Sequence, residues 1–310
     1  MEAGHSYFCL KIRGWNIGAG AERFVIVKPM NIRASVAMAA LGLAGLIHGA
    51  DLRVDHVTIA GRDLKEMRAH FGQAGIRTEY GGKHTNGLTE MALASFADGS
   101  YLELMAAQNP KAGAPSHYWG KFIDGNAGPC AWAIRSTDVA ADAKLYGGNI
   151  TEGGRRRPDG VELKWRTASI GAGVQGTFFP FLIQDVTARV LRAYPSGKPT
   201  EPNEGGVARV YIAVQNLNDA VTRYREVFHL KEPVKSVDPS LGARLASFEG
   251  TPVVLAGADG PWLKERLSKF GEAPCAFVLR GDGKRRVEWL PIAGMRIGVL
   301  KAAGRKAAER

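Results

Sequence analysis

The sequence predicts an α+β fold built from repeated modules, each with the element order strand, helix, strand, strand, strand. One observation behind this prediction is the first module itself. An alternating, β-branched run at 54–60 is followed by apolar residues at helical spacing, and Asp63 suits the N-cap position of that helix. The remaining elements expected in this module are a helix at 62–71 and strands at 76–80, 91–96 and 101–105.

The second observation is internal repetition, which decides the architecture. The run GPCAWAIR at 128–135 returns in kind as APCAFVLR at 273–280. The first strand and helix of the first module recur in kind at 210–221. We therefore expect four related modules in two halves. The halves are 51–195 and 205–300, and the linker is the segment rich in proline, glycine and glutamate at 194–206.

Composition indicates an ordinary globular chain. Of the 310 residues, 45% are hydrophobic and 23% are charged. The net charge of +11 and a pI near 9.7 favour a small anionic ligand, although part of this charge lies in the basic tail 301–310. The sequence has no helix-turn-helix, zinc-finger or aromatic RNA-binding motif, so no nucleic-acid partner is expected.

Residues 1–50 are expected to form a leader outside the folded domains. Segment 30–50 has a short basic stretch, fourteen uncharged residues and then Gly49 and Ala50, which is the layout of a signal peptide. The uncharged stretch is too short to cross a bilayer, so no stable membrane span is expected in the mature chain. Segment 1–29 has no such pattern, which favours translation starting at Met30. The protein is thus expected to be secreted or periplasmic, with a cytoplasmic location as the alternative.

Two polar residues, His56 and Glu103, stand on predicted strands among apolar neighbours. Because side chains alternate along a strand, His56 shares a face with Thr58, whereas Asp55 and Val57 share the opposite face. Glu103 likewise lies opposite its aliphatic neighbours. The aliphatic faces are expected to pack under a helix. The sequence therefore predicts that His56 and Glu103 face a common concavity, away from the helices.

The run DHVTIAGRDL, the helix after it and the run ALASFADGSYLELM resemble the vicinal oxygen chelate superfamily, in particular its glyoxalase-like branch. The resemblance implies modules paired into curved, incomplete-barrel sheets that enclose a cup. It also implies a divalent metal, Zn, Fe, Mn or Ni, held by a histidine on a first strand and a glutamate on a last strand. His56 and Glu103 occupy those positions. Such a metal would bind two neighbouring substrate oxygens and stabilise an enediolate, or activate dioxygen if it is iron.

The other modules do not complete this set of ligands. Two protein ligands are fewer than the three or four of typical catalytic sites. The neutral amide of Gln184 would be a poor ligand for these metals. The residues found at the equivalent positions are Ala131 and either Ile183 or Gln184 in the second module, and Arg209 and Val254 in the third.

Two loop histidines and an aromatic group are expected near the mouth of the cup. His84 and His117 each either supply a further ligand or acid–base group, or are simply solvated. Tyr118, Trp119 and Phe122 either form a small core under the connection between modules or form a wall for the substrate.

The basic segment 155–166 predicts an anion site. If its apolar residues pack under a helix, alternation turns Lys164 and Arg166 toward the cup, where Arg166 can bind a carboxylate or phosphate with two hydrogen bonds. The alternative is an internal ion pair of Arg166 with Glu162 or Glu103. The residues expected to bind substrate are Arg157, Lys164, Arg166 and Gln184.

Two cysteines fall within the predicted modules. Cys130 and Cys275 stand at equivalent places in two apolar strands. They are expected either to be small buried hydrophobic residues or, in an exported protein, to form a disulfide.

Two functions fit these features. The first is a metal-dependent lyase, isomerase or dioxygenase that acts on a small, oxygen-rich anionic substrate through His56 and Glu103. The alternative is a non-catalytic protein that binds or sequesters a small molecule in a metal-free cup, because fold alone does not fix function. The oligomeric state is open, since such modules pair within or between chains.

Overall fold

The computed structural model describes residues 52–112, 118–201, 205–280, 285–292 and 295–302. The expected leader, His117 and residues 303–310 of the expected basic tail lie outside the described residues. Within these ranges, no helix is long and apolar enough to cross a membrane.

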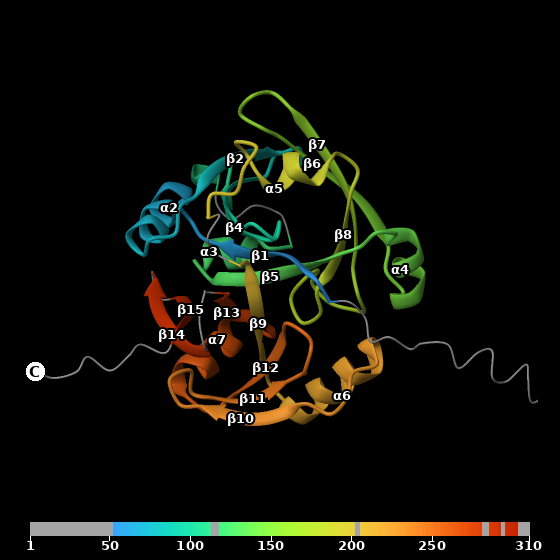
Figure 1. Ribbon diagram of the computed structural model, residues 1–310, viewed down its shortest axis with the longest axis vertical. Helices are drawn as coiled ribbons and strands as arrows, with labels where there is room; N and C mark the ends of the chain where they lie inside the picture. Colours follow the sequence, from blue (N-terminus) through green and yellow to red (C-terminus); the bar gives the residue numbers. More distant parts are fainter. Residues whose placement is uncertain (1–51, 113–117, 202–204, 281–284, 293–294, 303–310) are drawn as a thin grey trace, which may run out of the picture. The chain divides into compact units, whose positions relative to one another are not determined.

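The first two modules close into an eight-stranded barrel with strand order β1-β4-β3-β2-β6-β7-β8-β5 (Figure 1). The predicted element order of the first module is confirmed. That module consists of β1 (Val54–Ala60), α2 (Leu64–Gln73), β2 (Glu79–His84), β3 (Thr89–Ser95) and β4 (Tyr101–Ala107). Two short helical segments follow, η1 (Pro110–Ala112) and α3 (Gly120–Asp124). The second module consists of β5 (Gly128–Arg135), α4 (Val139–Tyr146), β6 (Ile150–Arg156), β7 (Glu162–Ala168) and β8 (Phe181–Asp185).

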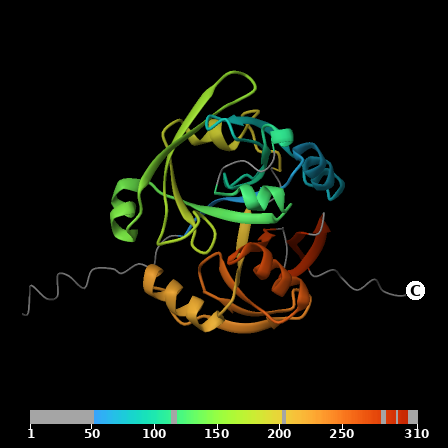
Figure 2. The same ribbon diagram turned by 180° about the vertical axis from the view of Figure 1, so that it is seen from behind.

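The second half is a seven-stranded sheet with strand order β10-β11-β12-β9-β13-β15-β14, seen from behind in Figure 2. Its strands are β9 (Val207–Val214), β10 (Val234–Asp238), β11 (Ala243–Ser247), β12 (Val253–Ala258), β13 (Ala273–Leu279), β14 (Arg285–Ile292) and β15 (Met295–Ala302). Helices α6 (Leu217–Phe228) and α7 (Pro261–Phe270) belong to this half, and α5 (Arg189–Ala193) precedes it. The third module is complete, but the expectation of a full fourth module is wrong. Its described part has three strands and lacks the helix that follows the first strand in the other modules.

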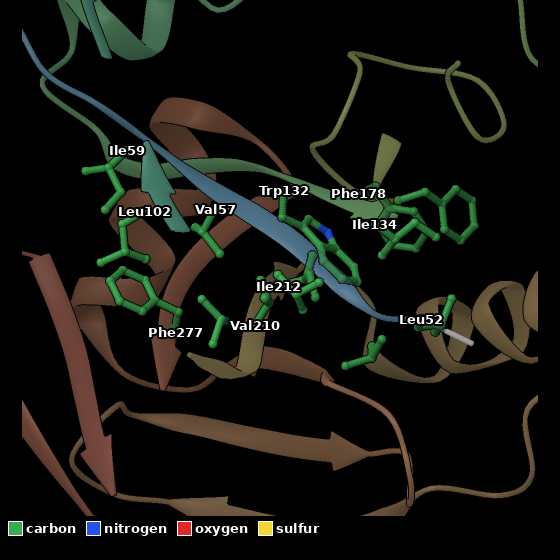
Figure 3. Packing of buried hydrophobic residues seen from close by; sticks show 14 of the residues in the cluster. Leu52, Val57, Ile59, Leu102, Trp132, Ile134, Phe178, Val210, Ile212 and Phe277 are labelled. Carbon is green, nitrogen blue, oxygen red and sulfur yellow. The ribbon is translucent and has the colours of Figure 1, made fainter. Parts of the chain in front are cut away.

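The aliphatic faces of the barrel strands are buried as predicted. Val57 and Leu102, on β1 and β4, are fully buried in one large cluster with side chains from β9 and β13, among them Val210 and Phe277 (Figure 3). Trp132 on β5 belongs to the same cluster. These side chains leave the opposite faces of β1, β4 and β5 to line the inside of the barrel.

The equivalent inner face of the second sheet is filled by a helix. Tyr211 on β9 and Val254 on β12 pack in one apolar cluster with Leu263 and Leu267 of α7. Cys275 belongs to this cluster too, and both Cys275 and Cys130 are buried and free, so the disulfide alternative is wrong. The barrel, by contrast, keeps an open cavity in its interior.

The barrel closes where β2 meets β6, and Gly82 permits the close approach. Gly82 has φ +109°, and a Cβ on it would lie 2.0 Å from the carbonyl oxygen of Arg156. Gly82→Ala is therefore expected to lower the free energy of unfolding by about 1–3 kcal/mol, measured by urea denaturation. The control is Gly72→Ala in α2, where a Cβ would meet no atom within 4 Å. Equal stability of the two variants would contradict the prediction.

Candidate active site

A cavity of about 380 Å³ lies inside the barrel, and both modules contribute to its wall. His56 and Glu103 line it together, as strand alternation predicts. The second module contributes the apolar side chains of Phe181 and Ile183 on β8 and Trp165 on β7, and also polar ones that include Arg155 on β6. The His56 and Glu103 pair on the first module therefore faces a mixed apolar and polar wall on the second.

Glu103 is the centre of the polar cluster. It is 4% exposed, and its Oε2 accepts a hydrogen bond of 2.9 Å from the hydroxyl of Thr58. The Nε2 atom of His56 lies 3.7 Å from Oε2, and the Nε2 atom of His84 lies 3.5 Å from Oε1. Two imidazole rings thus approach the two oxygens of one carboxylate. Burial opposes ionisation of this carboxyl, but the interactions with His84, His56 and Thr58 outweigh it and lower its pKa to about 2.

His84 lies at the end of β2 and lines the cavity, so the interpretation of it as a solvated loop residue is wrong. Its side chain is 12% exposed, and its Nδ1 lies 2.8 Å from the hydroxyl of Thr89 on β3. Barrel closure explains this placement, because His84 pairs with Arg155 across the β2–β6 junction. The strand extends further than the sequence pattern suggests, since Gly81 and Gly82 interrupt the hydrophobic alternation.

The side of the His56 ring that faces away from Glu103 contacts the neighbouring Asp55. The Nδ1 atom of His56 lies 2.7 Å from Asp55 Oδ1, and the imidazole ring stacks on Tyr101 at a centroid distance of 4.8 Å. The expectation that Asp55 shares the helix-facing side with Val57 is wrong. The β1–β5 register shifts between Val54 and His56, so a bulge at this point lets Asp55 depart from simple alternation.

The Asp55 carboxylate is enclosed by two arginines from α5. It is fully buried, Arg192 donates to both of its oxygens at 3.0 and 2.9 Å, and Arg189 also pairs with it. Burial opposes its ionisation, but Arg192, the hydrogen bond with His56 and Arg189 hold the pKa of Asp55 well below its usual range. The sequence reasoning missed this cluster, because α5 falls in a segment next to the predicted linker. The sequence feature that could have indicated this cluster is Asp55 itself, an aspartate inside an otherwise apolar strand.

The prediction that Lys164 and Arg166 face the cup is wrong. Trp165 and Thr167 line the cavity, whereas Lys164 and Arg166 are exposed on the outside of β7. The reason is that the inside of the barrel is itself largely apolar, so an apolar face of β7 does not identify the helix side. Arg166 Nε lies 3.8 Å from Oε1 of Glu152, and neither proposed partner, Glu162 or Glu103, pairs with it.

The other two predicted substrate residues bind protein groups outside the cavity wall. Arg157 pairs with Asp159 and donates to the carbonyl of Pro195. Gln184 accepts from the backbone of Val139 at 3.2 Å and so supports the start of α4. Of the two residues considered equivalent to Glu103, Ile183 lines the cavity and Gln184 does not. The arginine of this segment that does line the cavity is Arg155, which the sequence reasoning passed over.

The aromatic group after the first module divides between the two roles considered for it. Tyr118 and Trp119 line the cavity. Phe122 is 1% exposed and stacks on Phe270 of α7 at a centroid distance of 5.6 Å. Ala131, at the position equivalent to His56, is fully buried in the apolar cluster that also contains Phe122.

The comparisons with known proteins agree with this architecture. The sequence pattern of a family described as a glyoxalase-like domain matches residues 54–228. The crystal structure of a hypothetical protein from Staphylococcus aureus is similar with a TM-score of 0.59 and 15% identity, covering 80% of this chain and 98% of that one. This likeness supports the fold alone. None of the curated proteins compared with the chain matches it.

Two further solved structures have lower similarity. One is a mutant of 4-hydroxymandelate synthase from Streptomyces coelicolor, with a TM-score of 0.46, 12% identity and coverage of 74% of this chain and 71% of that one. The other is methylmalonyl-CoA epimerase from Streptomyces coelicolor, with a TM-score of 0.32, 22% identity and coverage of 44% of this chain and 98% of that one.

Proposed function

The chain belongs to the glyoxalase-like domain family, and we propose that its barrel cup holds a divalent metal for a lyase, isomerase or dioxygenase reaction. The proposed substrate is a small, oxygen-rich anion. The observation that carries this proposal is the approach of His56 and His84 to opposite oxygens of the buried Glu103 carboxylate. His84 then supplies the ligand that the partner module lacks.

The donor set suits a first-row divalent ion, since it offers two imidazole nitrogens and one carboxylate. With metal–ligand bonds of about 2 Å, neighbouring donor atoms of a tetrahedral site lie about 3.3 Å apart. The observed nitrogen–oxygen separations are 3.5 and 3.7 Å, each within about 0.4 Å of that spacing. As the side chains stand, no group of three or more histidine, cysteine, aspartate or glutamate residues in the described part of the chain is arranged to hold a metal.

The bound ion would act as a Lewis acid toward neighbouring substrate oxygens. The protein's own contribution is orientation. Nδ1 of His56 lies at hydrogen-bond distance from the Asp55 carboxylate, which orients the ring so that Nε2 faces Glu103. Thr89 contacts Nδ1 of His84 in the corresponding position, and the Thr58 hydroxyl fixes one oxygen of Glu103. Each donor therefore has a second contact that sets its direction.

The apolar wall of the cup is suited to excluding water from a reaction at this cluster. Met105, Phe181 and Ile183 face the cavity from β4 and β8, and Trp165 faces it from β7. A low-dielectric surrounding strengthens the attraction between an anionic substrate and nearby cations.

The second candidate is a binding or sequestering protein with a metal-free cup. One observation favours it: Glu103 already receives a hydrogen bond from Thr58 and the close approach of two histidines. In this case the three residues would form a satisfied polar cluster, and the cavity would retain a ligand without turning it over.

Metal titration of the purified, chelator-treated protein separates the two functions. We expect one Zn²⁺, Mn²⁺, Fe²⁺ or Ni²⁺ ion per chain by calorimetry and elemental analysis. His84→Gln is expected to lower the affinity by at least about tenfold, since it removes one of three donors. His70→Gln on α2 is the matched control, because this histidine lies outside the cup. A folded wild-type protein that binds no stoichiometric ion would refute the enzyme proposal and favour the binding protein.

A further inference from the structure

Arg155 is a buried cation without an acidic partner. It is fully buried on β6, and its two terminal nitrogens donate to the backbone carbonyls of Gly81 and Arg192. Its Nε atom is buried and has no hydrogen-bond partner, and no carboxylate of the described residues forms an ion pair with it. An unpaired charge taken out of water is costly, so it calls for a physical explanation.

The other two buried arginines of the described chain make more hydrogen bonds to protein groups than Arg155 does. Arg192 is paired with Asp55 and Asp185. Arg266 donates to three backbone carbonyls, those of Ala127, Pro129 and Pro274. Arg266 also lies outside the wall of the cup, whereas Arg155 is part of it. Arg155 thus combines an incompletely used guanidinium with a position at the cavity.

We propose that Arg155 binds the carboxylate of a small organic acid inside the barrel cup. The inference rests on the proposed function in that both place the ligand in this cavity. The Nε–H of Arg155 is the donor that lacks a partner, and a carboxylate oxygen is a strong acceptor for a guanidinium N–H. The opposite polar end of such an acid then faces the His56, His84 and Glu103 cluster.

The charges and size of the cup favour a monoanionic carboxylate over a phosphate. Arg155 and Glu103 line the same cavity with opposite charge, so Glu103 repels a dianion at Arg155 more strongly than a monoanion. The volume of about 380 Å³ suits a small metabolite. Trp165 and Phe181 provide an apolar wall for a planar body.

The cost of burying Arg155 is also visible in its pKa. Burial is the main cause that lowers this pKa to about 10, and Tyr101 and Glu103 oppose it. The guanidinium therefore stays charged at neutral pH, and its environment leaves it less stabilised than an arginine in water. A bound carboxylate relieves that cost.

The test uses benzoate and its neutral analogue benzamide on the folded, chelator-treated full chain, with binding measured by calorimetry. Benzoate is expected to bind at least about tenfold more tightly than benzamide to the wild type, the size of a charge-assisted interaction. Arg155→Met is expected to weaken benzoate binding by about 10- to 100-fold. Arg166→Met, which removes the exposed arginine of β7, is expected to leave it unchanged.

Several results would overturn the proposal. These are equal binding of benzoate and benzamide, no benzoate binding by the folded wild type, unchanged benzoate affinity in Arg155→Met, or tighter binding of inorganic phosphate than of benzoate. The comparison of benzoate with benzamide on the wild type remains a test even if Arg155→Met does not fold. Arg155→Lys, which keeps a cation at this position, is the second variant. Because no metal is present, failure of the metal site leaves these results intact. A normal metal titration of a folded Arg155 variant separates the two proposals further.

Discussion

Asp55→Ala is expected to lower the free energy of unfolding by about 3–5 kcal/mol, the usual loss when one partner of a buried ion pair is removed. Asp55 is fully buried against Arg189 and Arg192. Without it, Arg192 keeps only Asp185 as an acidic partner. Equilibrium urea denaturation at pH 7 measures the change.

The matched control is Asp219→Ala on α6. Asp219 and Arg223 are both exposed and lie 3.8 Å apart, so this substitution is expected to change stability by no more than about 1 kcal/mol. Similar losses in the two variants would show that the buried cluster does not stabilise the fold as described.

Acid should reduce the difference between the wild type and Asp55→Ala. The pKa of Asp55 is held below its usual range, where burial opposes ionisation and Arg192, His56 and Arg189 favour it. The stabilisation is therefore fully present above the unfolded pKa of about 4 and is lost as pH falls through the folded value. The difference between the urea midpoints of the two proteins is expected to be smaller at pH 3 than at pH 7. A constant difference would contradict the assignment to this carboxylate.

The same cluster shows what strand alternation can and cannot predict. Alternation correctly placed His56 and Glu103 in one concavity, because both strands keep their regular pleat at those residues. It misplaced Asp55, because a one-residue bulge next to His56 changes the direction of a single side chain. Bulges depend on the partner strand, so the local sequence carries little sign of them.

The second module shows a different limit. Hydrophobicity assigned the apolar side of β7 to a helix, but Trp165 on that side lines the cup. In a closed barrel the interior also excludes water, so an apolar side chain is expected on either covered face. The same error drew attention to Arg166 and away from Arg155, whose strand partner Leu163 lies on the same covered face.

Closure of the barrel also accounts for His84. Local sequence places this histidine in a glycine-containing loop, and its place in the site follows only when β2 pairs with β6. The packing of α7 on the inner face of the seven-stranded sheet is another long-range feature. Helix α7 reaches β9 and β12 only through tertiary packing. The fold class and two of the three residues of the polar cluster, His56 and Glu103, were therefore predictable, whereas the parts that depend on strand closure were not.

Glu103→Gln is expected to abolish the stabilisation that a bound divalent ion gives. At a free-ion concentration 100 times its Kd, an ion that binds only the folded wild type adds about 2.7 kcal/mol of stability. For a domain of this size that corresponds to a rise in Tm of about 5–10 °C. Gln keeps the shape of Glu103 and can still meet the Thr58 hydroxyl, but it removes the anionic donor. Scanning fluorimetry with and without the ion measures the shift.

Glu90→Gln is the matched control. Glu90 lies on β3 of the same module as Glu103, but it accepts a hydrogen bond from Tyr80, and neither residue lines the cup. The ion should stabilise this variant as it does the wild type. An equal shift in Glu103→Gln would place the ion elsewhere and leave the histidine–carboxylate cluster as part of a metal-free cup. Loss of the shift in Glu103→Gln alone would tie the ion to the one carboxylate that both histidines approach.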